Sequence, residues 1–320
     1  MGKKIGICLL VLLALHSLPG CSIPNSVDIP ETTTAVTTEP VKTGWHTVGE
    51  AVYYYDLQGV AVTGWQEIDG KRYYFADDGV LQTGWLKQET GVYYLGNDGA
   101  MVTGWLQQEQ DQYYFGKTGE MAVGQVEIDG VSNFFTSQGK HVLLVNFENE
   151  VPNDYQPNLV KFGDYKIDAS CADALGQLFD ACKDAGYKCK INSAYRSKQQ
   201  QQKLWDKYYQ KYRDAGYSKK AATEKVGKSV AKPGSSEHHL GLAVDVGGNE
   251  KMQKWMKNHA WEYGFIVRYP EGKTNYTGII YEPWHIRYVG KELAKELYEL
   301  DLCMEEYMEK LTTSHSGLAG

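Results

Sequence analysis

Two histidines and two carboxylates in the second half of the chain have the residue types and spacing of a metal-dependent hydrolytic site. His238 and Asp245 lie seven residues apart, and Glu282 lies three residues before His285. Catalytic zinc takes three protein ligands and keeps one position open for water. It lowers the pKa of this water towards neutrality, and a carboxylate that does not bind the metal can then move the proton. The pattern predicts zinc-assisted hydrolysis, with Arg196 as a cation that stabilises negative charge.

Each of these motifs also has a structural interpretation. Taken alone, His285 can be a core histidine, His239 part of a solvated face and Arg196 half of a structural ion pair. The motifs nevertheless occur together and in this order, with Gly241 shortly after the first histidine and Trp284 directly before the last. This combination favours the catalytic interpretation.

The residues around the motifs alternate between helical and strand patterns, which predicts an α+β domain over residues 142–313. A strand over 189–194 is expected to end just before Arg196, and a strand over 242–246 is expected to contain Asp245. The expected helices are 167–186, 198–231, 250–263 and 290–311.

Three motifs carry a family resemblance: S-x-Y-R-S at 193–197, S-x-H-x-x-G-x-A-x-D at 236–245 and E-x-W-H-x-R-Y-V-G at 282–290. Together they resemble the VanY-type zinc D,D-carboxypeptidases, whose domain has the hedgehog-like α+β fold. The resemblance implies zinc ligands at His238, Asp245 and His285, a general base at Glu282 and an oxyanion-stabilising arginine at Arg196. It also implies substrate contacts at Ser236, Gln201, Tyr269 and Trp284, and it gives no role to His239.

The activity implied by this resemblance is removal of the C-terminal D-alanine from peptidoglycan stem peptides. The same zinc constellation serves L,D-carboxypeptidases and endopeptidases that act on peptidoglycan, so these activities are alternatives. A non-enzymatic wall-binding adhesin is a further alternative, against which the complete set of ligands argues.

The first half of the chain repeats with a period of twenty residues over 43–141. Each unit has a Thr-Gly-Trp start, a turn, a tyrosine pair and a closing glycine, which is the pattern of a β-hairpin. Single hairpins are marginally stable, so the units are expected to stack into a solenoid. The fifth unit has Gln125 in place of tryptophan, which suits a cap or a junction.

The repeats resemble the cell-wall-binding repeats of Gram-positive surface proteins, in which aromatic side chains bind choline or glycans. The resemblance places the ligand-binding aromatics at Trp45, Trp65, Trp85, Trp105, Tyr54, Tyr74, Tyr94 and Tyr114. Choline-binding repeats usually carry another tryptophan before the tyrosine pair, where this chain has Val52, Arg72, Val92 and Gln112. A glycan or a teichoic polymer is therefore an alternative ligand, and a third interpretation is that the aromatics only pack.

The N-terminus reads as an export signal over 1–21, with two lysines, an apolar run and a small-residue site that ends at Cys21. This site resembles the lipobox of bacterial lipoproteins and implies lipidation of Cys21. Residues 22–42 are rich in threonine and proline and read as a tether, and 314–320 as a flexible tail. The expected location is the outer face of the cell membrane and the wall of a Gram-positive bacterium.

Four cysteines remain after export: Cys171, Cys182, Cys189 and Cys303. Pairing of the first two is excluded because they are expected on one helix, roughly 16 Å apart, whereas a disulfide needs Cα atoms within about 7 Å. The preferred pairing is Cys182–Cys189 with Cys171–Cys303, and four free thiols are the alternative.

Composition excludes one large class of partners. The formal net charge is −7, with 33 Lys and Arg against 40 Asp and Glu. A nucleic-acid-binding protein needs a surplus of cations to neutralise phosphates, so nucleic acid is not expected as a partner.

Overall fold

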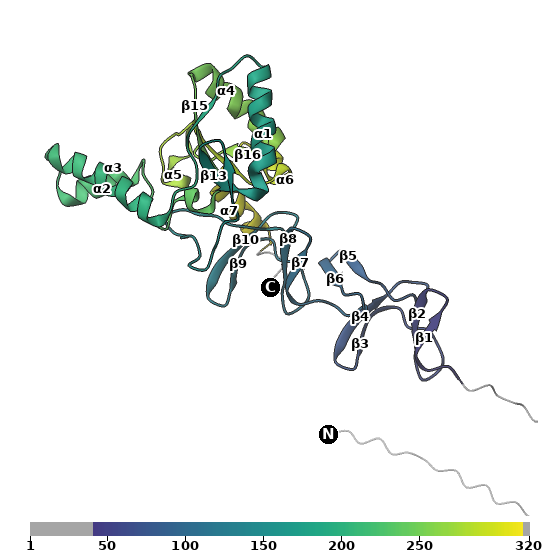
Figure 1. Cartoon of the computed structure of the whole chain (residues 1–320). Helices are drawn as coiled ribbons and strands as arrows, with labels where there is room; N and C mark the ends of the chain where they lie inside the picture. Colours follow the sequence, from purple (N-terminus) through teal and green to yellow (C-terminus); the bar gives the residue numbers. More distant parts are fainter. Residues whose placement is uncertain (1–40, 316–320) are drawn as a thin grey trace, which may run out of the picture.

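The structure, a computed structural model, describes residues 41–315, and the backbone alone for the last two of these. A row of β-hairpins leads into an α+β domain (Figure 1). The predicted signal, the lipidation site Cys21, nearly all of the tether and most of the tail lie outside these residues. Among the helices described, none combines the length and the apolar character needed to cross a membrane.

Five antiparallel hairpins confirm the predicted solenoid of twenty-residue units. Within each of the first four hairpins the tryptophan is the cross-strand partner of the second tyrosine, as in Trp45 with Tyr54. The strand pairs are β1 Gly44–Val48 with β2 Ala51–Tyr55, β3 Gly64–Ile68 with β4 Lys71–Phe75, β5 Gly84–Gln88 with β6 Gly91–Leu95, β7 Gly104–Gln108 with β8 Asp111–Phe115, and β9 Gly124–Ile128 with β10 Val131–Phe135.

The periodic glycines have two separate physical reasons. Asp69 and Gly70 both have positive φ, at 51° and 76°, which matches the tight turn that joins two twisted strands. A Cβ on Gly119 would lie 2.2 Å from the Met101 sulfur, so glycine is needed where one unit contacts the preceding unit. Backbone bonds also join the units, as from Met101 N–H to the Arg72 carbonyl at 2.8 Å.

The fifth hairpin is the junction with the α+β domain. A short strand, β11 His141–Val142, extends it to three strands. Phe134 of β10 is buried in one core with side chains of α6 Lys291–Leu300 and α7 Met304–His315. The backbone N–H of Gln125 also donates to the Thr312 hydroxyl at 2.9 Å. This unit therefore packs as part of the second domain.

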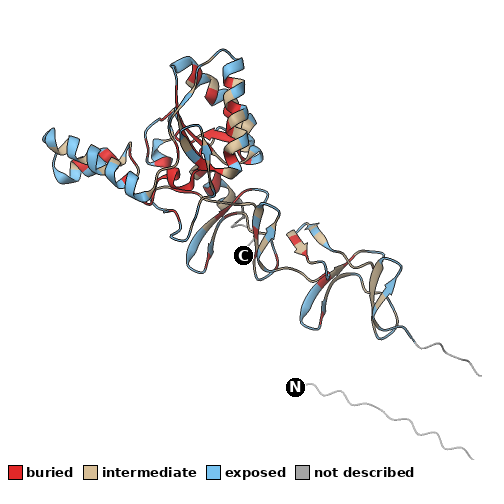
Figure 2. Cartoon of the chain, viewed as in Figure 1, coloured by how far each residue is buried: buried red, intermediate tan, exposed pale blue. Residues whose placement is uncertain are grey.

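The centre of the α+β domain is a four-stranded antiparallel sheet in the order β14-β15-β17-β16, as the sequence predicted for fold class. Its strands are β14 Lys190–Ser193, β15 Ala243–Gly247, β16 Phe265–Val267 and β17 His285–Tyr288. Helices α1 Ala169–Asp184 and α4 Glu250–His259 pack on the sheet and bury its main core (Figure 2). The remaining elements are the hairpin β12 Leu159–Phe162 with β13 Tyr165–Asp168, the 3-10 turns η1 Glu237–Leu240 and η2 Ala260–Tyr263, and α5 Thr274–Thr277.

Two expected helices are each divided in two. The segment predicted as one helix over 198–231 forms α2 Lys198–Asp214 and α3 Lys219–Gly227, separated at Gly216 with a φ of +88°. The predicted final helix ends at Asp301, whose φ of +51° cannot continue a right-handed helix, and α7 starts afresh.

Neither predicted disulfide is present, and all four cysteines are free thiols. The thiols of Cys182 and Cys189 do lie in hydrogen-bond contact, and burial followed by this contact raises the pKa of Cys182 to about 12. The Cys171–Cys303 pairing is wrong because the two side chains belong to different parts of the fold. Cys171 is in the sheet core, with its thiol 3.2 Å from the Asp168 carbonyl, whereas Cys303 directly precedes α7 and its N–H donates to Glu306.

Candidate metal centre and substrate pocket

The predicted ligands Asp245 and His285 lie together because they are direct cross-strand partners. Asp245 is the third residue of β15, His285 is the first residue of β17, and the antiparallel register pairs them. Directly paired side chains lie on the same face of a sheet. His285 Nδ1 is consequently 3.1 Å from Asp245 Oδ1.

The third predicted ligand, His238, comes from the 3-10 turn that precedes β15. Its Nδ1 lies 2.7 Å from the Ala194 carbonyl and donates to it, which leaves Nε2 with a free lone pair. Nε2 lies 3.3 Å from Asp245 Oδ2. Gly241 ends the turn with a φ of +72°, and a Cβ there would lie 2.9 Å from the Asp168 backbone nitrogen, so this glycine is required.

The chemistry of these donors fits a cation. Ligand atoms of His238, Asp245 and His285 all lie within 4.8 Å of one another. His238 Nε2 and Asp245 Oδ1 are buried without a hydrogen-bond partner in the part of the chain that is described. Buried polar atoms without a partner are costly, and a metal ion with nitrogen and oxygen ligands would satisfy them.

The charges at the site also favour a bound cation. Burial lowers the pKa of His238, so its imidazole is neutral as a metal ligand must be. Burial also opposes charge on His285, but the carboxylates of Asp245 and Glu237 raise its pKa to about 9. The two carboxylates thus favour a positive charge at this imidazole. A dication bound to the imidazole would supply such a charge.

Glu282 lies beside the three ligands without joining them. Its Oε2 is 3.9 Å from His285 Nδ1, and the two residues belong to a turn in which the His285 N–H donates to the Glu282 carbonyl at 3.1 Å. Burial raises the pKa of Glu282 to about 7. A carboxylate with a pKa near the working pH is suited to accept and return a proton.

Arg196 reaches the same site from the segment between β14 and α2. Its Nη2 is 3.7 Å from Asp245 Oδ2. His239, which the sequence left without a role, holds this segment: its Nδ1 donates to the Arg196 carbonyl at 2.6 Å, and its Nε2 accepts from the Gly234 N–H at 3.2 Å. His239 is therefore a positioning residue for the arginine.

All predicted substrate-binding residues line one cavity of about 340 Å³ above the ligands. The Gln201 amide nitrogen donates to the Ala231 carbonyl at 2.7 Å, and its oxygen is buried without a partner among the described residues. The Tyr269 ring is buried with its centroid 4.9 Å from that of His285. Ser236 and Trp284 also line the cavity, together with residues that the sequence missed, namely Leu204, Tyr208, Ser229, Val230, Ala231, Ile279 and Ile280.

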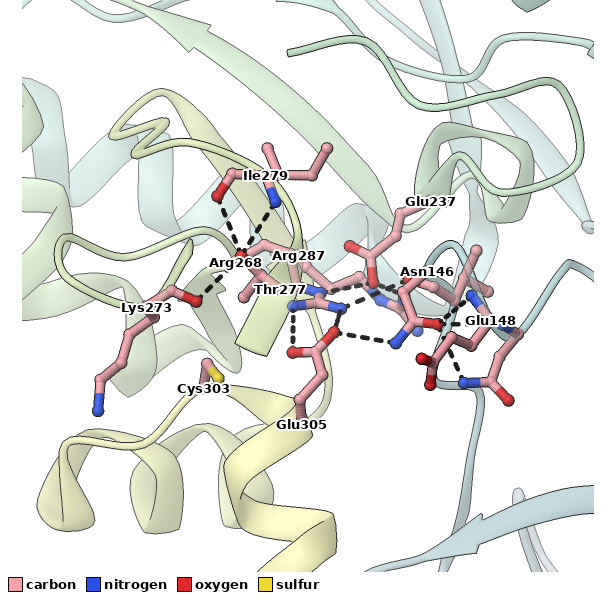
Figure 3. Close-up of polar contacts among 12 residues, drawn as sticks. Asn146, Glu148, Glu237, Arg268, Lys273, Thr277, Ile279, Arg287, Cys303 and Glu305 are labelled. Atoms are coloured by element: carbon pink, nitrogen blue, oxygen red, sulfur yellow. Dashed lines mark hydrogen bonds and ion pairs between the residues drawn. The ribbon is translucent and has the colours of Figure 1, made fainter. Parts of the chain in front are cut away.

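A buried ionic cluster around Glu237, which lies next to His285, was also missed (Figure 3). The Glu237 carboxylate accepts from Arg268 Nε at 2.8 Å and from Arg287 Nη1 at 2.9 Å. Arg268 also donates to both oxygens of Glu305 on α7, at 2.9 and 2.6 Å. These arginines hold the pKa of Glu237 low despite its burial. The available signal was the presence of single charged residues inside apolar strand segments at 265–270 and 285–289.

The predicted aromatics of the repeats form T-shaped clusters between neighbouring hairpins. Trp45 lies 5.2 Å from Tyr54 of its own hairpin and 5.0 Å from Tyr73 of the next, measured between ring centroids. As whole residues, Trp45, Trp85 and Trp105 are 40%, 48% and 47% exposed, so they are accessible to a ligand. Trp65 differs, because the Arg72 guanidinium lies 4.7 Å from its ring centroid.

Comparison with known families divides the chain in the same way. A family model described as D-alanyl-D-alanine carboxypeptidase, VanY, matches residues 164–291. Models described as choline-binding repeat and putative cell wall binding repeat match residues 62–104 and 103–121.

Individual relatives resemble the second domain. The chain is 39% identical over 175 residues to a D-alanyl-D-alanine carboxypeptidase of Enterococcus faecalis and 36% identical over 191 residues to YodJ, a putative carboxypeptidase of Bacillus subtilis. Each alignment covers 52% of this chain, and they cover 65% and 67% of the two relatives, so the chain spans about two thirds of their length.

Two solved structures are similar over the same region. VanYB in complex with D-alanine-D-alanine is 38% identical, with a TM-score of 0.51, and the match covers 52% of this chain and 96% of that one. A mutant VanY from a VanB-type resistance cassette, in complex with Zn(II), is also 38% identical, with a TM-score of 0.50 and coverage of 52% and 97%.

Proposed function

Because the chain belongs to the VanY family of D-alanyl-D-alanine carboxypeptidases, we propose that it removes the C-terminal D-alanine from peptidoglycan stem peptides with zinc as cofactor. One observation carries this proposal. The ligand atoms of His238, Asp245 and His285 converge within 4.8 Å at the base of a cavity, beside a carboxylate whose pKa is about 7.

Each side chain of the site has a part in amide hydrolysis. His238, Asp245 and His285 would hold zinc, which supplies a Lewis acid and a water of lowered pKa when it is bound. The Glu282 carboxylate takes a proton from water and returns it to the leaving amine. Arg196 offsets the negative charge that develops on the scissile carbonyl oxygen. Buried Gln201 and Tyr269 help to orient the peptide end in the cavity.

The test is the mass that a muropeptide loses on incubation with the enzyme. Loss of one alanine from a pentapeptide stem supports the proposal. Loss of one alanine from a tetrapeptide only would indicate an L,D-carboxypeptidase, and separation of cross-linked stems would indicate an endopeptidase. If the metal-loaded protein changes the mass of no muropeptide, the result would indicate a non-enzymatic wall-binding protein.

We also propose that the repeats hold the enzyme in the cell wall and that Cys21 anchors it to the membrane. The repeats match wall-binding models, and a peptidase of this family acts where peptidoglycan lies, outside the membrane. Three of the four tryptophans are accessible and could bind choline or a glycan. The Trp65 site is already filled by the Arg72 cation and is expected to bind a cationic ligand least. Tethering would raise the effective concentration of substrate.

A further inference from the structure

Helices α2 and α3 form a helical hairpin that projects from the α+β domain, and most of its surface is exposed (Figures 1 and 2). Residues 198–228 contain nine Lys and Arg and three Asp and Glu, a net charge of +6. Because the whole chain carries −7, the remainder carries −13. The hairpin is thus a cationic arm on an acidic protein, and no step of the proposed reaction uses this charge.

Three of these lysines form a continuous line, which we call the lysine stripe. Lys203, Lys207 and Lys211 are spaced four residues apart on α2, so they share one face of the helix. All three are exposed. Within residues 41–315, none of them makes an ion pair. The one cation–ring contact among the three in this range is that of Lys211, whose Nζ lies 5.9 Å from the centroid of the Tyr208 ring. Their charge is therefore available to a partner.

The lysine stripe borders the substrate cavity. Gln201, Leu204 and Tyr208 of the same helix line the cavity. Lys203 and Lys207 each precede one of these residues, and neighbouring residues on a helix are rotated by about 100°. The stripe therefore lies on the flank of α2 beside its cavity-lining face, and its three lysines span roughly 12 Å of the helix. A ligand that covers all three lysines must be at least that long.

The hairpin lacks the features of a membrane-binding helix. A helix that lies in a membrane interface needs an apolar face beside its cations. The less polar face of α2 is instead used within the hairpin, where the Trp205 ring faces Gly227 of α3 and Tyr212 faces Lys225. The stripe itself contains no apolar side chain. An extended, soluble polyanion fits this surface better than a bilayer.

We propose that the lysine stripe binds a linear phosphodiester polymer of the cell wall that lies alongside the substrate. Long-range attraction between the cationic hairpin and such a polymer would bring the cavity to peptides in polymer-rich regions of the wall. This binding is separate from hydrolysis, so it can be measured without any turnover.

The test compares three full-length proteins for binding to soluble poly(glycerol phosphate) by isothermal titration calorimetry at low salt. The stripe variant carries Lys203→Gln, Lys207→Gln and Lys211→Gln. The control variant carries Lys251→Gln, Lys254→Gln and Lys257→Gln on α4, which removes the same charge from another exposed helix. Since the repeats are identical in all three proteins, their contribution cancels. Unchanged thermal unfolding midpoints confirm that both variants are folded.

We expect the stripe variant to lose at least about tenfold in affinity and the control to stay within about twofold, with binding of the natural chain weakening steeply as salt rises. Equal losses in the two variants would show a net-charge effect and overturn the proposal. Unchanged affinity in the stripe variant would overturn it too. A chain that binds phosphatidylglycerol vesicles but not the polymer would identify the membrane as the partner and reject the wall polymer.

Discussion

Glu237 Oε2 lies 3.7 Å from His285 Nε2, and both atoms are buried without a hydrogen-bond partner among the described residues. Arg268 and Arg287 fix the other oxygen of the same carboxylate. The Nε2 edge of the imidazole points away from the proposed metal and thus lies next to a negative charge that the two arginines hold in place. Carboxylates in this position orient a ligating histidine and increase its basicity.

Replacing Glu237 with Gln is therefore expected to weaken zinc binding by about 10- to 100-fold. The measurement is competition with a chromophoric chelator. Glu305→Gln serves as the matched control, because it disturbs Arg268 in the same cluster but does not face His285. Equal losses of zinc affinity in the two variants would make Glu237 a structural residue and not a positioning residue for the metal ligand.

Glu282→Gln separates proton transfer from metal binding. The amide keeps the shape of the side chain but cannot accept a proton at neutral pH, so turnover should fall by about 10²- to 10⁴-fold. Zinc should remain at one equivalent, whereas His285→Ala should lose the metal. Elemental analysis beside D-alanine release measures both. Zinc loss in the glutamine variant would make Glu282 a ligand, and near-normal turnover would remove it from the mechanism.

The pH dependence of turnover should also report on Glu282. Burial raises its pKa to about 7, and the protonated form cannot take a proton from water. Activity is therefore lost as the pH falls through this pKa and is retained above it. A bound dication favours the carboxylate, so the acid limb of kcat/KM in the zinc enzyme should lie below pH 7. Glu282→Gln should lack this limb, and its persistence there would assign it to another group.

The first four repeats are expected to retain the enzyme on walls without contributing to hydrolysis. Deletion of 43–121 should abolish binding to isolated walls and change cleavage of a small soluble peptide by no more than a few-fold. Deletion of 43–141 is a different experiment, because it removes Phe134 from the core that it shares with α6 and α7 and should lower the unfolding temperature. Collapse of small-peptide turnover in the shorter deletion would show that the repeats form part of the active site.

Lipid anchoring predicts that Cys21→Ala leaves an uncleaved precursor or releases soluble protein. The cysteine thiol is the only group at this position that can be acylated in the proposed way, and acyl chains would supply the membrane affinity. Membrane fractionation followed by intact-mass measurement checks this. A processed alanine variant that still sediments with membranes would contradict it.

Sequence reasoning found the residues whose chemistry is visible in their type and spacing. His238, Asp245 and His285 were predicted together; strand pairing brings Asp245 and His285 together, and the turn before β15 adds His238. The cluster of Glu237, Arg268 and Arg287 was missed because single arginines in apolar strand segments suggest burial but do not show which carboxylate they share. The break at Asp301 was missed for a related reason, since the helical pattern continues through it and only tertiary packing selects a left-handed residue there.

Helix α7 contacts both the last hairpin and the ionic cluster near the proposed metal centre. Thr312 contacts β9 of the last hairpin, and Tyr307 shares a core with Phe134, while Glu305 binds Arg268 of the ionic cluster. In mechanical terms, α7 is a second connection between the repeats and the enzyme, beside the backbone that continues from β11. A pull on repeats fixed in a growing wall would be shared between this backbone and the contacts of α7. The same helix carries Glu305, so it connects the wall-bound end of the protein to the Arg268 ion pair.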